Sequence, residues 1–533
     1  MPPRKKTRSS GETMWTWIQD HKLLLFLLLV GILVRTYHFG AIPPGLNQDE
    51  ASTGYDAWAV LKYGIDRNGF HFPVMFVAWG SGMYALSGYL AWPFMVFFGL
   101  SEVTVRLPHL VMGCIALMVF YHLLKNISDR STALIGLFLL VINPWHIMVS
   151  RWGLDSNLFP ACFLLGVFTL THALTKKRYA ILPLAAGLFA LCLYFYGTAY
   201  VVIPVFLFLT GILLFFRHRI PWNISMRSGI AFAIIALPIV LYVVINQFHL
   251  TSLELPFLSI PRLSGVPRFQ TVSSLFSSNF FHHLLENGKN LWNLLLHQDD
   301  GLAGNRVPGF GMLYPPGILF AFLGLIVCLQ RSVRTKGKDP SVSMLLWFLS
   351  AVTVGLLQSV NINRINIIVF PLIFFMTMGI RFFWEKNRTI FFSVIGLFSL
   401  YFLFFVHAYF TWYPIDVKDA FFSGLREAIA SASEHTTEKI CVTERVNQPY
   451  IFVLFEEKID PHVFLNTAEI INPGAEFQGV RRFGRYTFGL DSCHDATYGA
   501  YVLHRDERDI FPSQDYHRED FDVYSVAIPL HKS

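Results

Sequence analysis

Long apolar runs separated by short polar segments recur from residue 22 to residue 409. Most of these runs approach the length of about 18–20 residues that an α-helix needs to cross the hydrocarbon core of a bilayer. The pattern therefore predicts a polytopic α-helical membrane protein. About eleven transmembrane helices are expected, over residues 22–39, 105–124, 132–149, 158–174, 180–195, 200–216, 228–246, 314–330, 342–359, 367–384 and 389–409.

Basic residues lie in every second polar segment between the predicted spans. They occur in the tail before the first span and in five loops, at 125–130, 176–178, 217–227, 331–338 and 381–388. The positive-inside rule assigns these segments to the cytoplasm. The tail 1–21 is then cytoplasmic, the transmembrane domain covers 22–412, and large extracytoplasmic loops are expected at 40–104 and 247–313. Eleven crossings also place the C-terminus outside.

The apolar and aromatic segment 83–99 does not fit this alternation as a further span. It contains Gly88 and Pro93, together with tyrosine and tryptophan residues that favour the headgroup region. We expect a helix that lies along the outer membrane surface.

From about residue 413 the composition becomes that of a soluble domain. Residues 419–434 have the apolar spacing of an amphipathic helix. Strand-like runs follow at 439–446, 451–455, 499–503 and 522–529. About 120 residues are enough for a small folded unit. We expect an extracytoplasmic α/β domain over 413–533.

The composition supports a membrane protein and argues against a nucleic-acid-binding one. Hydrophobic residues make up 54% of the 533-residue chain and charged residues 14%, whereas soluble proteins carry about 25% charged residues. The net charge of +7 comes from residues in short loops between spans. We therefore expect no nucleic-acid partner and a multi-pass location in the cell membrane.

The paired acids Asp49 and Glu50 lie just beyond the first predicted span. Acids at a membrane boundary are costly to desolvate, so the pair indicates a solvated loop or a functional site. A carboxylate here could serve as a general base toward a hydroxyl group. It could instead stabilise the N-terminus of a helix beginning near Ala51.

Three more outer segments carry polar residues that could contact a substrate. In the loop 143–157, Arg151 could bind phosphate, and His146, Asp155 and Asn157 could line a cavity; an ordinary aromatic-belt loop is the alternative. Arg364 lies in a turn between two apolar spans and could bind a lipid phosphate or extend toward headgroups. The glycine- and proline-rich end of 247–313, with Arg306 and then Tyr314, could be a flap over the site or a plain connector.

Two of the six cysteines, Cys441 and Cys493, lie in the C-terminal region that is predicted to be outside. A disulfide could persist there, although two free thiols are the alternative. No Cys-x-x-Cys pair or metal-ligand spacing is present.

The order of these motifs resembles the GT-C superfamily of membrane glycosyltransferases, in particular the bacterial branch related to protein O-mannosyltransferases and lipid A aminoarabinose transferases. The resemblance covers most of residues 20–410. It rests on the acid pair in the first outer loop and on short motifs at Gly69–Pro73, Arg106–Pro108, Pro144–Arg151, Gly311–Pro315 and Arg364–Asn366.

The resemblance implies transfer of a hexose or pentose from a polyprenyl-phosphate carrier to an acceptor at the outer face of the membrane. Asp49 would deprotonate the acceptor hydroxyl, and Glu50 would position it. Arg151, Arg364 and Arg306 would bind the donor phosphate, because guanidinium groups are always charged and can bind it in a bidentate manner. His146, Asp155, Asn157 and Tyr314 would line the substrate cavity. Direct displacement would invert the anomeric centre.

The resemblance implies no obligatory cofactor. A monophosphate leaving group supported by arginine can depart without a metal, so a divalent cation is possible but not required. The expected partners are the polyprenyl-phosphate-linked sugar, membrane lipid and an acceptor that is a protein, a glycan or a lipid. A ligase or polymerase of surface polysaccharide is the nearest alternative. A transporter is less favoured, because the polar residues gather at one membrane face.

Overall fold

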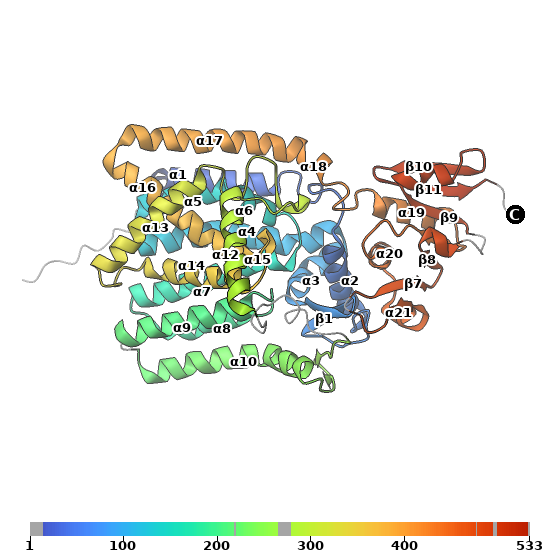
Figure 1. The fold of residues 1–533 in the computed structure, drawn as a ribbon, viewed down its shortest axis with the longest axis horizontal. Helices are drawn as coiled ribbons and strands as arrows, with labels where there is room; N and C mark the ends of the chain where they lie inside the picture. The colour runs from blue at the N-terminus through green and yellow to red at the C-terminus, as the bar shows by residue number, and fades with distance from the viewer. Residues whose placement is uncertain (1–13, 218–219, 265–278, 476, 494–497, 531–533) are drawn as a thin grey trace, which may run out of the picture.

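The structure is a computed structural model that describes residues 14–217, 220–264, 279–475, 477–493 and 498–530, with side chains from residue 21 onward. The basic residues of the predicted tail lie outside this range. Long helices run side by side in a bundle at one end of the molecule, and a β-sheet with short helices forms the other end (Figure 1). The helices α2 (Gln48–Tyr63) and α3 (Leu86–Phe98) lie between these two parts.

Each predicted span overlaps a helix of the bundle. Seven helical segments of the described chain are long and apolar enough to cross a membrane, and α5 and α8 are among the shorter apolar helices. The bundle helices are α1 (Met14–Thr36), α4 (Glu102–Ile127), α5 (Arg130–Val141), α7 (Leu158–Thr175), α8 (Leu182–Cys192), α9 (Ala199–Arg217), α10 (Trp222–Gln247), α13 (Gly317–Arg334), α14 (Val342–Leu357), α16 (Val369–Lys386) and α17 (Arg388–Thr411).

The predicted single helix over 132–149 is wrong, because the chain breaks after α5 and resumes as α6 (Pro144–Val149). A proline disfavours helical backbone in the residue before it. Asn143 accordingly has extended backbone (φ −68°, ψ 123°), and its side chain accepts a hydrogen bond from the N–H of His146.

The predicted loop 40–104 is folded. It contains α2, the hairpin of β1 (Met75–Ala78) and β2 (Ser81–Tyr84), and α3. Helix α3 packs against both α2 and α4, and it exposes Phe97 and Phe98 at its C-terminal end. The interfacial position of this helix stays a prediction.

The predicted loop 247–313 also contains regular structure. A short hairpin of β3 (Leu253–Leu255) and β4 (Leu258–Ile260) is followed by α12 (Phe280–His297). Residues 265–278 lie outside the described chain. A turn-rich segment, 298–316, then leads into α13.

The C-terminal region forms a seven-stranded sheet in the order β10-β11-β9-β5-β8-β7-β6. The central strand β5 is parallel to both neighbours, and the other pairs are antiparallel. Helix α19 packs on β9 and β11 and also contacts α20. The elements are α19 (Leu425–His435), β5 (Ile440–Val442), α20 (Pro449–Glu457), α21 (Pro461–Thr467), β6 (Glu469–Ile471), β7 (Gly479–Phe483), β8 (Tyr486–Phe488), β9 (Ala500–His504), β10 (Tyr516–Phe521) and β11 (Tyr524–Pro529).

One predicted strand of this domain is wrong: residues 451–455 belong to helix α20. A short continuous apolar run fits a buried strand and a buried helix equally well. Pro449 occupies the first turn, where a proline favours a helix start. Residues 450–455 are buried all round because α20 lies between α19 and α2.

The segment between α1 and α4 and the C-terminal region share one hydrophobic core. Tyr55 of α2 packs in the same cluster as Ile429 and Phe452. The hydroxyl group of Tyr55 donates a hydrogen bond to the carbonyl of Ile459 over 2.7 Å. Arg426 of α19 also forms ion pairs with Glu102 of α4 and with Glu456. The helices α19 and α20 thus connect the sheet to α2, which carries the acid pair, and to α4.

Of the two alternatives left open for Cys441 and Cys493, a disulfide or two free thiols, the structure has the disulfide. The two cysteines form a disulfide with a Cα–Cα separation of 6.3 Å. Cys441 lies in β5, and Cys493 ends a short 3₁₀ turn (Leu490–Cys493) that follows β8, the parallel neighbour of β5.

Candidate functional site

The acid pair lies in the first turn of α2. Asn47 caps this helix: its side chain accepts from the N–H of Asp49 over 2.9 Å, and its own N–H donates to Glu50 over 3.0 Å. Because the helix dipole favours negative charge at its N-terminus, this position stabilises both carboxylates. The two residues differ in exposure, since Asp49 is partly exposed whereas Glu50 is fully buried.

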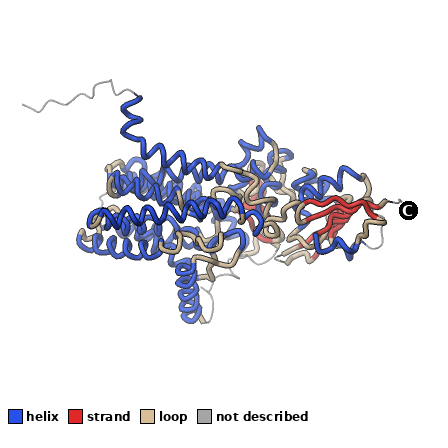
Figure 2. Tube along the Cα trace, turned by 90° about the horizontal axis from the view of Figure 1, so that it is seen from above, coloured by secondary structure: helices blue, strands red, loops and turns tan. Residues whose placement is uncertain are grey.

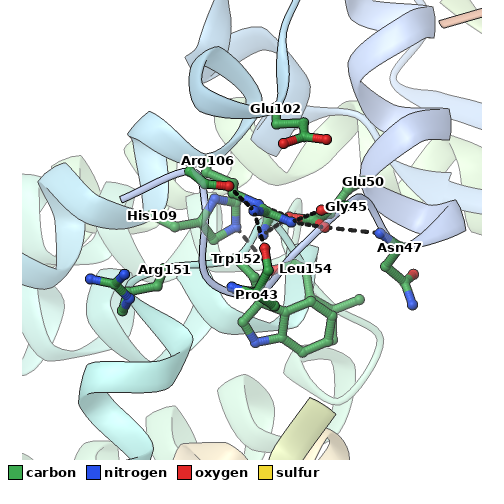
Figure 3. A network of polar contacts seen from close by, with 12 residues as sticks. Pro43, Gly45, Asn47, Glu50, Glu102, Arg106, His109, Arg151, Trp152 and Leu154 are labelled. Carbon is green, nitrogen blue, oxygen red and sulfur yellow. Dashed lines mark hydrogen bonds and ion pairs between the residues drawn. The ribbon is translucent and has the colours of Figure 1, made fainter. Parts of the chain in front are cut away.

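Glu50 is bound by Arg106, which lies in the first two turns of α4. The Nε and Nη2 groups of Arg106 donate to the two carboxylate oxygens over 2.8 and 2.9 Å. The same guanidinium also donates to the carbonyls of Gly40, Pro43 and Gly45. Figure 3 shows this guanidinium between Glu50 and the turn at residues 43–45. Glu50 therefore joins α2 to α4 and to the end of the first span.

Glu50 is held in its ionised form. Burial would raise the pKa of this carboxyl, but the charge of Arg106 and the hydrogen bonds from Arg106, Asn47 and Gly153 hold the pKa below its ordinary value. Such a buried and paired carboxylate is a poor proton acceptor.

The loop 152–157 is fixed from three sides. The N–H of Gly153 donates to Glu50 Oε1 over 2.6 Å. The imidazole Nε2 of His109 lies 3.0 Å from the carbonyl oxygen of Leu154, and the side chain of Asn366 donates to the carbonyl of Ser156 over 2.9 Å. A side chain on Gly153 would approach the Glu50 carboxylate to 3.2 Å, so a glycine allows this close contact.

Asp155 lies within this fixed loop and is partly exposed. Its carboxylate accepts from the N–H of Ser156 over 2.7 Å. Burial, and then the neighbouring Tyr200, Tyr242 and Asp155, hold the pKa of Tyr84 well above its ordinary value. The hydrogen bond from Gly153 to Glu50 connects the loop of Asp155 to the residue that follows Asp49.

Arg364 and Arg306 lie on two segments that are joined by Asp300. Asp300 Oδ2 accepts from the N–H of Ile362 and from the side chain of Asn305, each over 2.8 Å. Arg364 is partly exposed and donates to the carbonyl and hydroxyl oxygens of Ser359. Within the described chain no carboxylate pairs with it, whereas Arg306 forms an ion pair with Asp299 over 2.7 Å.

The guanidinium of Arg151 makes its hydrogen bonds to groups inside the protein. Arg151 is fully buried, and it donates to the carbonyls of Arg35 and His38 at the C-terminal end of the first span. It also lies over the rings of Tyr409 and Phe410. Figure 3 shows its side chain apart from the Glu50–Arg106 contact. The geometry gives Arg151 the contacts of a helix-capping residue.

His146, Asn157 and Tyr314 are also buried. His146 Nδ1 accepts from Arg35 over 2.7 Å, and both His146 and Asn157 line a small internal cavity beside His109. The hydroxyl group of Tyr314 donates to the carbonyl of Ile142 over 2.6 Å, and its ring stacks on Tyr401. These residues stabilise the polar loops from within.

Three residues that fix the site were not identified as site residues from the sequence: Arg106, Asn366 and Asp300. Arg106 belongs to the motif Arg106–Pro108 that supports the family resemblance, but the sequence gives no sign that Glu50 is its partner. Asn366 and Asp300 bond to segments that are 210 and 62 residues away, and no local pattern reveals such contacts.

A grouping of potential metal ligands occurs away from the acid pair in sequence. In the described chain, three or more histidine, cysteine or acidic side chains converge only at His282, His283 and Glu286 on α12. These side chains are exposed or half-buried, and the helix carries neither Asp49 nor Asp155.

Comparisons with known proteins agree with this architecture. Residues 85–252, from the start of α3 to five residues beyond the end of α10, match the family model described as dolichyl-phosphate-mannose-protein mannosyltransferase. The fold matches that of ArnT from Cupriavidus metallidurans bound to undecaprenyl phosphate, with a TM-score of 0.58. The resemblance to GT-C membrane glycosyltransferases is confirmed. This fold likeness covers 97% of this chain and 98% of ArnT at 9% identity, so it includes the C-terminal sheet.

The oligosaccharyltransferase AglB from Archaeoglobus fulgidus also matches, with a lower TM-score. Its complex with an inhibitory peptide and a dolichol-phosphate is 12% identical, with a TM-score of 0.48 over 83% of this chain. A complex with zinc and sulfate is 14% identical, with the same TM-score. The chain spans only 64% and 61% of these two AglB chains. No curated protein matches the chain by sequence.

Proposed function

We propose that this protein transfers a sugar from a polyprenyl phosphate to an acceptor hydroxyl at the outer face of the membrane. One observation carries the proposal most directly. Of the paired acids, Glu50 is buried and bound by Arg106, whereas Asp49 stays partly exposed at the same helix end. The part match to a mannosyltransferase family and the fold of ArnT, which binds undecaprenyl phosphate, support this assignment.

In the proposed reaction, the Asp49 carboxylate accepts the proton of the acceptor hydroxyl. The acceptor oxygen attacks the anomeric carbon, and the bond between that carbon and the phosphate oxygen breaks. Polyprenyl phosphate leaves with the electron pair of that bond. Because attack and departure occur on opposite faces of the sugar, the anomeric centre inverts. A general base of this kind contributes about 10²–10⁴-fold to the rate.

The remaining roles follow from exposure and charge. Arg364 is the first candidate for the donor phosphate, because its charge is not paired with a carboxylate in the described chain. Arg306 is the second candidate, and the donor phosphate would have to replace Asp299 as the partner of its guanidinium. Asp155 would orient a hydroxyl of the sugar or the acceptor. Glu50 and Arg106 position Asp49 by fixing the start of α2.

We further propose the membrane topology that follows from the basic loops. The eleven bundle helices would each cross the bilayer, with the N-terminus in the cytoplasm and the sheet outside. The end of the bundle that carries α2, α6 and the turn at Arg364 would then face the outer leaflet. A polyprenyl-phosphate donor in that leaflet could reach Asp49 without leaving the membrane.

The donor class can be tested with purified protein and a membrane extract as acceptor source. Radiolabelled hexoses and pentoses on polyprenyl monophosphate should transfer, and the product should have the opposite anomeric configuration by NMR. The same sugars on polyprenyl diphosphate should not transfer. Transfer from the diphosphate alone would identify a ligase or polymerase of surface polysaccharide and would contradict the proposal.

A further inference from the structure

Helix α12 has three distinct faces along its 18 residues. One face is buried, one is apolar but exposed, and one is polar. An amphipathic helix of a soluble protein needs only two faces, one toward the core and one toward water. The exposed apolar face of α12 therefore indicates an environment that is neither the protein core nor water.

The buried face attaches α12 to the bundle. The side chain of Asn287 donates to the carbonyl of Leu356, at the C-terminal end of α14, over 3.1 Å. Leu291 packs against Gly355, where an added Cβ would approach its side chain to 2.7 Å. This end of α14 leads directly into the turn that carries Arg364. Helix α12 is thus held at the level of the candidate site.

The second face is a stripe of large apolar side chains that are each between 45% and 77% exposed. Its members are spaced by four, seven and four residues, so they share one side of the helix. Phe281 is 77% exposed and Trp292 is 59% exposed. The stripe consists of Phe281, Leu285, Trp292 and Leu296.

The third face is polar and exposed. It includes Lys289, Asn293 and Glu286, and histidine residues extend it toward both ends. On a helical wheel, this face is next to the apolar stripe and opposite part of the buried face. Such a division suits a helix at a boundary between apolar and aqueous phases.

The orientation of α12 agrees with such a boundary. In Figure 1 it runs across the long bundle helices rather than along them, and in Figure 2 it projects from one side of the bundle. A helix that lies across membrane-spanning helices lies in the plane of the membrane. We infer that the exposed stripe of α12 binds the lipid surface of the outer leaflet. Trp292 then lies at headgroup depth, where tryptophan is enriched.

This lipid contact is connected to the candidate site. Gln298 ends α12, and its side chain accepts from the N–H of Leu313 and donates to the carbonyl of Tyr314. The next residues, Asp299 and Asp300, hold Arg306 and the N–H of Ile362. The depth of α12 in the lipid therefore sets the distance between the membrane surface and the segment that carries Arg306. The lipid contact itself does not depend on the proposed function.

Single spin labels on α12 test the inference in the full chain reconstituted in nanodiscs of phosphatidylethanolamine and phosphatidylglycerol. Leu285→Cys and Leu296→Cys report on the apolar stripe, and Lys289→Cys and Asn293→Cys are matched controls on the polar face. Accessibility is measured with oxygen, which concentrates in lipid, and with a water-soluble nickel chelate. The unsubstituted protein gives the background from its own free cysteines.

We expect the ratio of oxygen to nickel accessibility to be several-fold higher at residues 285 and 296 than at residues 289 and 293. Equal nickel accessibility at all four positions would place the stripe in water and overturn the inference. Protection of residues 285 and 296 from both reagents would overturn it too, because a protein partner or a second copy would then cover the stripe.

Discussion

At the scale of single residues, the two acids that are adjacent in sequence have different environments. Glu50 is surrounded by donors from α4 and from the loop 152–157, whereas Asp49 is partly exposed one residue earlier. A buried, ionised carboxylate suits a structural role, and a partly exposed one suits contact with substrate. The sequence predicted the pair as a unit and could not separate the two roles, because the separation depends on Arg106, 56 residues away.

Glu50→Ala should destabilise the protein strongly. The substitution leaves the guanidinium of Arg106 buried without a carboxylate, and removal of one partner of a buried ion pair costs about 3–5 kcal/mol. We expect a clear fall in the thermal midpoint of the detergent-solubilised protein. Glu434→Ala, at an exposed position of α19, is the control and should leave the midpoint unchanged. A stable Glu50→Ala protein would mean that Glu50 does not fix α2.

Arg364→Ala should weaken binding of the donor lipid more than it slows saturated turnover. A phosphate contact that is made equally in the ground state and the transition state mainly affects KM. We expect KM for the polyprenyl-phosphate sugar to rise about tenfold or more with little change in kcat. Arg334→Ala serves as the control, because Arg334 is an exposed arginine at the C-terminal end of α13. An unchanged KM would make Arg364 an anchor for headgroups instead.

At the scale of elements, most helices follow from apolar periodicity, and the errors have local causes. Pro144 divides a predicted span, and the uniformly apolar run in α20 hides its helical period. Helix α12 lies within the predicted loop 247–313, although the hydrophobic spacing of residues 280–297 is that of a helix. What could not be predicted is the junction of α2 with the C-terminal sheet, since its contacts join residues about 400 positions apart.

Among the described residues beside that junction, the carboxyls of Asp56 and Asp66 and the guanidinium of Arg67 are buried. Burial, and then the charge of Asp56, raises the pKa of Asp66 to about 7, and burial raises that of Asp56 to about 6. The folded state therefore binds protons that the unfolded state has released above about pH 4. Stability should be greatest in mild acid and should fall as the pH rises through 6 and 7.

Asp66→Asn should flatten this pH dependence. The asparagine oxygen can keep the hydrogen bonds from the N–H groups of Asn68 and Phe70, and the neutral amide needs no proton. We expect the thermal midpoint of the unsubstituted protein to fall between pH 5.5 and pH 8, and that of the variant to change less. Asp509→Asn, at an exposed position, should keep the original slope. Identical slopes for both variants would show that Asp66 does not titrate in this range.

At the scale of the whole molecule, the alternation of basic loops predicts one topology for all eleven bundle helices. The structure agrees with a helical membrane fold that has a sheet domain at one end. Placement of that domain outside the membrane is a prediction that a reporter can test. A fluorescent protein that matures only in the cytoplasm, fused after Ser533, should be dark in intact cells. The same reporter fused before Met1 is the control and should be bright; a bright C-terminal fusion would mean an even number of crossings.

The central claim is that Asp49 accepts the proton of the acceptor hydroxyl, and Asp49→Asn tests it most directly. The amide keeps the size of the side chain and removes its basicity, so Glu50 and Arg106 should still hold α2 in place. Turnover of a polyprenyl-monophosphate sugar by the purified variant should fall by about 10²–10⁴-fold, with an unchanged thermal midpoint and unchanged donor binding. Asp509→Asn should retain full turnover. Near wild-type turnover by a folded Asp49→Asn protein would contradict the account.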